Sequence, residues 1–369
     1  MNTLMNISSV IYSPNTWLPV DVTWDHLNKY IDNTIFIYSL PIAVILMIMK
    51  YFLERCCFVY FGKCLGINDT KVKMVPPNEI LEKAYINQKL QEKQILSLAK
   101  QLDLSERQIK KWIRIRCSQN KSSKLRKFCE SGWRCFYYTC SFSYGLIILW
   151  NKPWLWDINH CYYNYPNHVV TNDIWWYYAI SIGFYLLSSI SQFFDVKTKD
   201  FWQIFIHHMI TNLLLYISWL MNWIRIGSLI LLLHDSSEIF LEMAKMTNYA
   251  NYQRTCDLLF IIFTIIWIVT RICIFPFWII HSAITEVSKL MINLSFYIFS
   301  TLLSLLFVLH VIWTCVIIRI AYNAFYVGQV EGDIRSESDE SDIENFDNYT
   351  IRNDATSYTE KRSHRKQTH

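Results

Sequence analysis

The sequence is poor in charge. Asp, Glu, Lys and Arg make up only 18% of its 369 residues, whereas hydrophobic residues make up 53%. A soluble chain of this length needs more charged surface than that, so the balance excludes an ordinary soluble domain. Several apolar runs are long enough to cross a bilayer and predict a polytopic membrane protein instead.

The sequence also lacks an ordered cysteine framework. Its 11 cysteines include no CxxC pair and no regular spacing, so we predict neither a disulfide scaffold nor a zinc site. Residues 1–33 lack the basic start and the small-residue cleavage site of a signal peptide, which predicts that this segment is retained.

The apolar runs predict an all-α fold with about seven transmembrane helices. The expected spans are 34–53, 132–150, 174–194, two runs between Asp200 and Tyr249, 256–280 and 296–322. The first span is preceded by Asp21, Asp25 and Asp32 and followed by Lys50, Arg55 and Lys63. The positive-inside rule therefore predicts a luminal N-terminus and, by alternation, a cytosolic C-terminus. A luminal N-terminus would expose Asn6, in the sequon Asn6-Ile7-Ser8, to N-glycosylation.

Residues 66–127 are basic and predict a small cytosolic helical insert. The pattern reads as helix, turn, helix, with Ser105 as the N-cap of the second helix. The segment resembles the second half of a homeodomain, whose recognition helix carries WFxNxR with an Asn that bonds adenine. Ile115 stands at the position of that Asn and Cys117 at the position of the Arg. We therefore predict no sequence-specific DNA binding.

A dense cationic face accompanies this insert. It consists of Lys110, Lys111, Arg114, Arg116, Lys121, Lys124, Arg126 and Lys127. The simpler interpretation is anchoring on anionic membrane lipid, at about 1 kcal/mol per residue near the surface. The alternative is attraction of the coenzyme A phosphates.

Ionisable side chains interrupt the two runs between Asp200 and Tyr249. They are His207, His208, His234, Asp235, Glu238 and Glu242. Such groups cost roughly 2.5 kcal/mol or more in a spanning helix, so they usually face a protein interior or a polar cavity. Two neighbouring helices with this feature predict one shared site.

Helix geometry places these groups at similar depth. From a boundary near Asp200, His207 lies roughly 10 Å inside, while Glu238 and His234 lie about 10 and 16 Å inside on the antiparallel helix. Glu238 and Glu242 continue the stripe that starts at His234, and Thr211 is one turn from His207. Because His207 and His208 are about 100° apart, one of them at most is expected to point straight into the site.

These two runs resemble the Lag1 motif of the ceramide synthase family, which lies in its TLC domain. The resemblance rests on HH at 207–208, SW at 218–219, RxG at 225–227 and LHDSSEIFLEMAK at 233–245. It extends over about residues 71–341, including the homeodomain-like insert that many animal members carry. The family usually has Asp where this chain has Glu238, which keeps the carboxylate but lengthens it by one methylene.

The resemblance implies a ceramide synthase, an endoplasmic reticulum membrane enzyme that N-acylates a sphingoid base with fatty acyl-coenzyme A (acyl-CoA). The TLC-type helical bundle or barrel, about 131–325, would be catalytic, with acyl-CoA as co-substrate and no cofactor. Acyl-chain length is tied in the family to the last luminal loop, here about 281–295. The resemblance also implies a homo- or heterodimer.

The chemistry assigns roles to the polar residues. An ammonium must lose a proton before it attacks, and the thioester oxygen must be stabilised as charge builds on it. We predict that His207 and His234 handle protons, with His208 beside them, and that Asp235 and Glu238 orient them or hold the amine. An acyl-imidazole route through one histidine stays open. Substrate-binding candidates are Arg225, Glu242 and Thr211, although Arg225 near a span end is typical of a snorkelling residue.

Two rival functions remain. A metal enzyme could use the same His and carboxylate ligands, but the chain lacks the HxxxH and HxxHH clusters of membrane di-iron hydroxylases. A non-catalytic TLC-domain protein that binds or carries lipid is the other alternative. Four other histidines have no partner at helical spacing, and we interpret them as structural or solvated. They are His160, His168, His281 and His310.

Residues 328–369 predict a disordered cytosolic tail, acidic and serine-rich at first, since they show no apolar periodicity. Ser336 and Ser341 each have an acidic residue three positions on, which suits an acidophilic kinase. Arg335-Ser336 is similar to the phosphorylated tail of the family.

Overall fold

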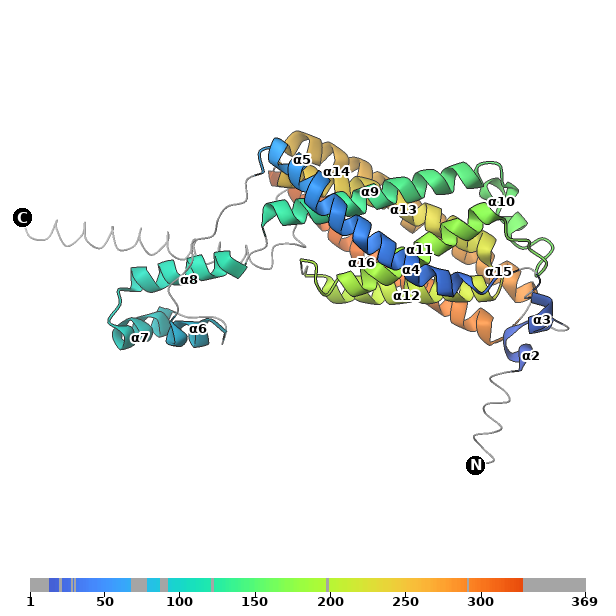
Figure 1. Cartoon of the computed structure of the whole chain (residues 1–369), viewed down its shortest axis with the longest axis horizontal. Helices are drawn as coiled ribbons and strands as arrows, with labels where there is room; N and C mark the ends of the chain where they lie inside the picture. The colour runs from blue at the N-terminus through green and yellow to red at the C-terminus, as the bar shows by residue number, and fades with distance from the viewer. Residues whose placement is uncertain are drawn as a thin grey trace, which may run out of the picture. The chain divides into compact units, whose positions relative to one another are not determined.

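The computed structural model in Figure 1 describes residues 13–19, 22–27, 29, 31–67, 78–86, 92–120, 123–196, 199–290 and 292–327. Across these ranges every regular element is a helix and none is a strand, which confirms the all-α class. The chain forms two compact units, divided near Ile67 and Lys127. Asn6, Ser336 and Ser341 lie outside the described residues.

The large unit holds the long apolar helices. In chain order they are α2 (Pro14–Trp17), α3 (Trp24–Leu27), α4 (Ile35–Phe52), the π-helix η1 (Leu53–Phe58), α5 (Val59–Cys64), α9 (Lys124–Leu149), α10 (Pro153–Trp156), the 3₁₀ helix η2 (Ile158–Cys161), α11 (Asn172–Ser191), α12 (Phe201–Leu220), α13 (Ile224–Tyr249), α14 (Gln253–Trp267), the π-helix η3 (Ile268–Ile280), α15 (His281–Leu290) and α16 (Leu294–Val327).

Close helix packing builds the core of this unit. Helix α11 packs along α4 and against α12, while α13 packs along α14 and α12 packs on α16. At Gly183 on α11, an added Cβ would lie 3.2 Å from the backbone nitrogen of Ala43 and the carbonyl oxygen of Ser39. Glycine therefore permits the close approach of α4 and α11.

Three helices are long and apolar enough to cross a membrane: Ile35–Cys64, Gln253–Leu290 and Leu294–Asn323. They correspond to the first, sixth and seventh predicted spans. Helices α9, α11, α12 and α13 have 20 to 26 residues, but their Tyr, Trp, Ser, His and charged residues lower their hydropathy. The seven-span count therefore stays a prediction.

Two helices extend past the predicted limits. The helix that contains the first predicted span, 34–53, continues to Cys64. There Phe58 packs on Gly132, where an added Cβ would lie 2.6 Å from the Phe58 ring. The predicted loop at 281–295 is mostly helix α15, His281–Leu290. Its amphipathic pattern buries Val287 and joins Lys289 to Glu286 at 2.6 Å.

The small unit contains α6 (Glu79–Ile86), α7 (Glu92–Leu102) and α8 (Glu106–Asn120). Ser105 caps α8 as predicted. The backbone N–H of Gln108 donates to Ser105 Oγ at 3.3 Å, and the backbone N–H of Ser105 donates to Gln108 Oε1 at 2.8 Å. Arg116, assigned above to the cationic face, pairs with Glu82 of its own unit. The homeodomain-like character of the insert stays a prediction.

Candidate functional site

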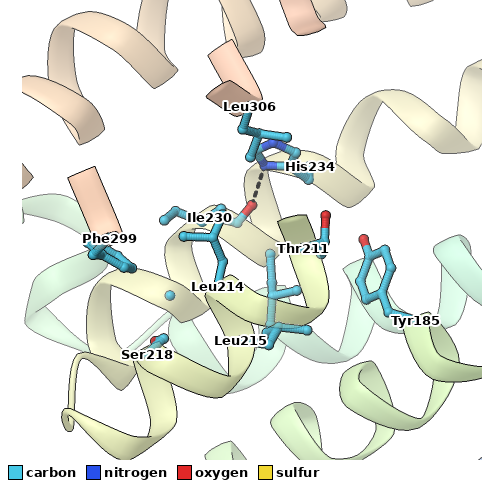
Figure 2. Close-up of a pocket in the computed structure, with 11 residues that line it drawn as sticks. Tyr185, Thr211, Leu214, Leu215, Ser218, Ile230, His234, Phe299 and Leu306 are labelled. Carbon is cyan, nitrogen blue, oxygen red and sulfur yellow. Dashed lines mark hydrogen bonds between the residues drawn. The ribbon is translucent and has the colours of Figure 1, made fainter. Parts of the chain in front are cut away.

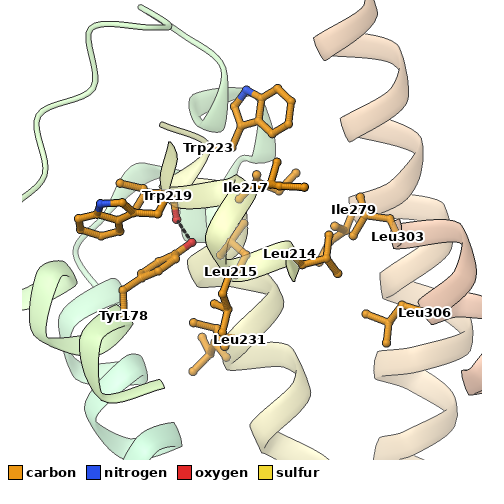
Figure 3. Packing of buried hydrophobic residues seen from close by; sticks show 14 of the residues in the cluster. Tyr178, Leu214, Leu215, Ile217, Trp219, Trp223, Leu231, Ile279, Leu303 and Leu306 are labelled. Carbon is orange, nitrogen blue, oxygen red and sulfur yellow. Dashed lines mark hydrogen bonds between the residues drawn. The ribbon is translucent and has the colours of Figure 1, made fainter. Parts of the chain in front are cut away.

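The turn between α12 and α13 is locked by the SW and RxG residues (Figure 3). Ser218 Oγ donates to the Trp223 carbonyl at 2.9 Å and lies 3.0 Å from Tyr178 Oη. Tyr178, which Figure 3 shows beside Trp219, also donates from Oη to the Ile224 carbonyl at 3.0 Å. The fully buried Trp219 donates from Nε1 to the Asp32 carbonyl at 3.1 Å. A Cβ at Gly227 would overlap Tyr178 Oη. This part of the motif fixes how α12 enters α13.

Arg225 contacts the loop that follows α9 rather than the polar cluster. Its Nη1 donates to the His160 carbonyl at 2.7 Å, and its guanidinium lies 4.9 Å from the Trp154 ring centroid. These contacts organise the loop. In the same loop His168 is structural, as predicted: its Nε2 lies 2.9 Å from the Tyr163 carbonyl, and burial lowers its pKa.

His234, on α13, is buried and held in one tautomer. Its Nδ1 lies 2.7 Å from the Ile230 carbonyl oxygen. A carbonyl can only accept, so Nδ1 carries the proton and Nε2 keeps its lone pair. Nε2 is buried and has no hydrogen-bond partner among the described residues. The arrangement presents a base or nucleophile whose orientation is already set.

Aromatic contacts connect His234 to His207. The ring centroid of His310 lies 5.1 Å from that of His234 and 5.8 Å from that of Trp267. The ring centroid of Trp313 lies 6.3 Å from that of Trp267 and 5.4 Å from that of His207. The two predicted histidines therefore belong to one aromatic cluster. His310, 1% exposed, belongs to it as well, although its sequence context had no partner at helical spacing.

His208 and Thr211 flank this cluster on α12. His208 turns toward Tyr185, with ring centroids 6.2 Å apart, whereas His207 meets Trp313. The two imidazole rings have different aromatic neighbours, although their own centroids are 5.8 Å apart. Thr211 Oγ1 donates to the His207 carbonyl at 2.8 Å and also lines the pocket described below.

The three carboxylates of α13 have different partners. Ser141 Oγ donates to Asp235 Oδ2 at 2.6 Å, and both side chains are buried. Glu242 Oε1 lies 3.0 Å from Arg134 Nε and 2.8 Å from Lys245 Nζ. Glu242 is therefore occupied by two cations, which favours a structural role over the predicted substrate contact.

Glu238 faces Arg271, a residue that sequence reasoning missed. Arg271 comes from η3 and is 2% exposed. Its Nη2 donates to the His234 carbonyl at 2.7 Å, to Ser237 Oγ at 3.1 Å and to Glu238 Oε1 at 3.3 Å. Its Nε and Nη1 are buried and have no partner within the described ranges. A single arginine in an apolar run was the available signal.

Arg271 is the electrostatic centre of the cluster. It lies close enough to His207, His234 and His310 to act on the charge of each. Its guanidinium also lies 5.1 Å from the Trp267 ring centroid, within the range of a cation–π contact. A buried cation with unused N–H donors is suited to hold an anionic or strongly polarised oxygen.

An apolar pocket extends from His234 to the α12–α13 turn (Figure 2). Figure 2 shows His234 and Ser218 at opposite ends, with Phe299 along one side. The lining residues are Tyr185, Thr211, Leu214, Leu215, Ser218, Gly227, Ile230, Leu231, His234, Phe299 and Leu306. Most of this surface is Leu, Ile or Phe, so the pocket suits a hydrocarbon chain with a reactive group at His234.

The described residues contain no group of three or more His, Cys, Asp or Glu side chains placed to hold a metal ion. His207 and His234 are linked through aromatic rings, and Asp235, Glu238 and Glu242 point to separate partners.

Comparison with known proteins identifies the family of this chain. The family model for the TLC domain matches residues 127–319. Human ceramide synthase 5 is 38% identical over 346 residues, covering 90% of this chain and 88% of its own. Human ceramide synthase 4 is 38% identical, covering 92% and 88%. Ceramide synthase hyl-1 of Caenorhabditis elegans is 42% identical over 230 residues, covering 58% and 62%.

An all-helical bundle with long apolar helices and a matching family model defines a TLC-domain membrane protein. Within that class, the identity across about nine-tenths of the chain shows that it belongs to the ceramide synthase family.

Proposed function

We propose that this protein transfers a fatty acyl group from acyl-CoA to the amine of a sphingoid base, forming ceramide or dihydroceramide. The observation that carries the proposal is His234 Nε2, a buried and unpartnered nitrogen at one end of an apolar pocket. The acyl chain would lie among Leu214, Leu231 and Phe299, with its thioester carbonyl at His234. The pocket supplies apolar contact for the chain, and the histidine supplies the reactive nitrogen.

His234 has two chemical routes. As a general base, Nε2 removes a proton from the sphingoid ammonium, and the free amine attacks the thioester carbon. The carbon–sulfur bond then breaks, and coenzyme A leaves as the thiol with the proton that the nitrogen gives up. As a nucleophile, Nε2 attacks that carbon first, coenzyme A leaves as the thiol after gaining a proton, and the amine then takes the acyl group from the imidazole. Both routes need the proton to stay on Nδ1, which donates it in the hydrogen bond to the Ile230 carbonyl. His207 is the second proton-handling group in each, with His208 behind it.

Arg271 would stabilise the oxygen on which negative charge develops. Its Nε and Nη1 are donors that no described residue uses, and its Nη2 is anchored on α13. Donors fixed in place before the reaction stabilise the transition state without reorganising. Asp235 and Glu238 would hold the ammonium, with Asp235 oriented by Ser141.

The membrane topology is part of the proposal. Helices α9, α11, α12 and α13 would add four spans to the three long apolar helices. An odd number of spans puts the two termini on opposite sides of the membrane. The positive-inside rule would then assign the N-terminus to the lumen of the endoplasmic reticulum and the C-terminus to the cytosol. Asn6 would then be glycosylated, and the tail serines Ser336 and Ser341 would be open to kinases. An endoglycosidase-sensitive mobility shift that disappears in Asn6→Gln tests this topology, whereas a glycan on Asn348 would overturn it.

The second candidate, a lipid carrier without catalysis, differs in one measurable respect. A carrier returns its lipid unchanged, whereas an acyltransferase forms an amide. The decisive experiment supplies purified protein with a sphingoid base and a mixture of acyl-CoA donors and identifies products by mass spectrometry. N-acylated products that disappear in His234→Ala support the proposal; bound but unmodified sphingoid base supports the carrier.

A further inference from the structure

The end of the first long helix carries three thiols that the proposed reaction does not use. Cys56 and Cys57 lie in η1 and Cys64 ends α5, and all three are exposed. Cys57 and Cys64 are seven residues apart, which is about two helical turns and brings them to one side. The three thiols therefore share a surface of one helix.

The other side of this helix is held against the bundle. Phe58 packs so tightly on α9 that a Cβ at Gly132 would lie 2.6 Å from its ring. Gly62, one turn from Phe58, is buried on the same side, whereas Phe61 is 47% exposed and contacts Phe128 from the edge of the outward side, at 5.9 Å between ring centroids. Because these contacts fix the rotation of the helix, Cys56, Cys57 and Cys64 face outward in the folded protein.

Their depth corresponds to the edge of a membrane. Cys56 is 21 residues beyond Ile35, or about 32 Å along a helix, close to the roughly 30 Å hydrocarbon thickness of a bilayer. Arg55 and Lys63 are exposed beside the thiols, and Tyr51 and Tyr60 are 62% and 71% exposed. Basic and aromatic side chains together are typical of a membrane–water interface on the cytosolic side.

We propose that Cys56, Cys57 and Cys64 form a site of reversible S-acylation, with fatty acyl-CoA as the acyl donor. Each cysteine sulfur gives up its proton and bonds to the acyl carbonyl carbon, while the carbon–sulfur bond to coenzyme A breaks and the coenzyme A thiolate takes up the proton. The attached chain enters the neighbouring lipid and pins this end of the helix. The inference goes beyond ceramide synthesis and rests on the proposed cytosolic orientation.

The other cysteines differ in a way that sharpens the assignment. Cys129, Cys161 and Cys256 are buried. Cys273 and Cys315 are also exposed, but they lie inside the candidate spans Gln253–Leu290 and Leu294–Asn323, whereas Cys64 is the last residue of Ile35–Cys64. Attack on a thioester requires the thiolate, and therefore contact with water. Cys273 and Cys315 thus serve as matched controls.

The test uses the full chain expressed in animal cells. Free thiols are blocked with N-ethylmaleimide, thioesters are cleaved with neutral hydroxylamine, and the released thiols are tagged with maleimide-polyethylene glycol. We expect hydroxylamine-dependent mobility shifts in the wild-type protein. The shifts should disappear in the Cys56→Ser/Cys57→Ser/Cys64→Ser variant and persist in Cys273→Ser/Cys315→Ser.

Absence of shifts in the wild-type protein, or unchanged shifts in the triple variant, would overturn the inference. Shifts that require a reductant instead of hydroxylamine would show disulfides and would also overturn it. Turnover of the sphingoid base is measured in parallel and should be unchanged in the triple variant. Loss of wild-type turnover with intact hydroxylamine-dependent shifts would contradict only the proposed function, so the two claims fail separately.

Discussion

The two units of the molecule differ in whether the polar atoms discussed above have hydrogen-bond partners. In the small unit an apolar core of Leu81, Ile95, Leu98, Ile109, Trp112 and Ile113 is buried. The Ser105–Gln108 cap satisfies both of its backbone amides. In the large unit His234 Nε2 and two nitrogens of Arg271 are buried with no partner among the described residues.

This difference separates groups that stabilise the fold from groups available for chemistry. A buried donor or acceptor without a hydrogen bond costs about 1–3 kcal/mol. The cap on α8 contributes stability, whereas the free nitrogens of His234 and Arg271 cost stability unless a substrate provides the missing bonds. Unpartnered polar atoms beside an apolar pocket therefore mark the site more specifically than the presence of polar residues in a membrane helix.

Removing the buried cation should reduce turnover more than any of the carboxylate and cap substitutions that follow. Arg271→Met leaves Glu238 without its ion pair and removes the donors proposed to hold the thioester oxygen. Loss of such donors typically reduces turnover about 10²–10³-fold. Turnover in detergent and thermal unfolding of the same preparation provide the measurement. Arg271→Lys keeps the charge and should recover part of the turnover; wild-type turnover in Arg271→Met would refute the assigned role.

The carboxylate at Glu238 should be sensitive to charge more than to length. Glu238→Gln keeps the size but loses the charge that pairs with Arg271, so turnover should fail. Glu238→Asp restores the residue usual in the family and should keep substantial turnover if Arg271 moves to close the 3.3 Å contact. Equal turnover in Gln and Asp variants would show that the charge is not used.

Substitution of Glu242 tests whether this residue stabilises the fold or binds substrate. Glu242→Ala leaves Arg134 and Lys245 without their carboxylate. Because the Arg134 side chain is 32% exposed, water can solvate the freed cation, and the cost should fall below the roughly 3–5 kcal/mol of a fully buried pair. We expect a lower thermal midpoint but normal turnover per folded molecule at low temperature. A selective rise in the KM for the sphingoid base at unchanged stability would restore the substrate-binding role predicted from the sequence.

The small unit should give the smallest effect. Ser105→Ala removes the side-chain cap of α8, which typically costs about 1 kcal/mol, and leaves the site of the large unit untouched. Limited proteolysis between residues 78 and 120 should become faster, while sphingoid-base turnover stays at the wild-type level. A large loss of turnover would indicate that the small unit contributes to catalysis.

The sequence predicted the helical class and the motif helices well, because long apolar runs and a dense motif are local signals. It missed Arg271 and His310, since each is a single polar residue in an apolar run, and only the packing of η3 and α16 brings them to His234. Helix ends were also misplaced. Two helices continue past the ends of their apolar runs, and tertiary contacts stabilise these extensions. Phe58 packs on Gly132 in the first, and Val287 is buried in the second.

The most direct test of the account is the turnover of His207→Ala and His234→Ala, measured with a sphingoid base and acyl-CoA in detergent beside thermal stability. Loss of a general base typically costs a factor of about 10²–10⁴, and loss of a covalent nucleophile should leave less. We predict that both variants fold and lose turnover, and that the double variant is little worse than His234→Ala, because the residues act as a unit. Near-normal turnover in both single variants would contradict the account and favour a lipid carrier.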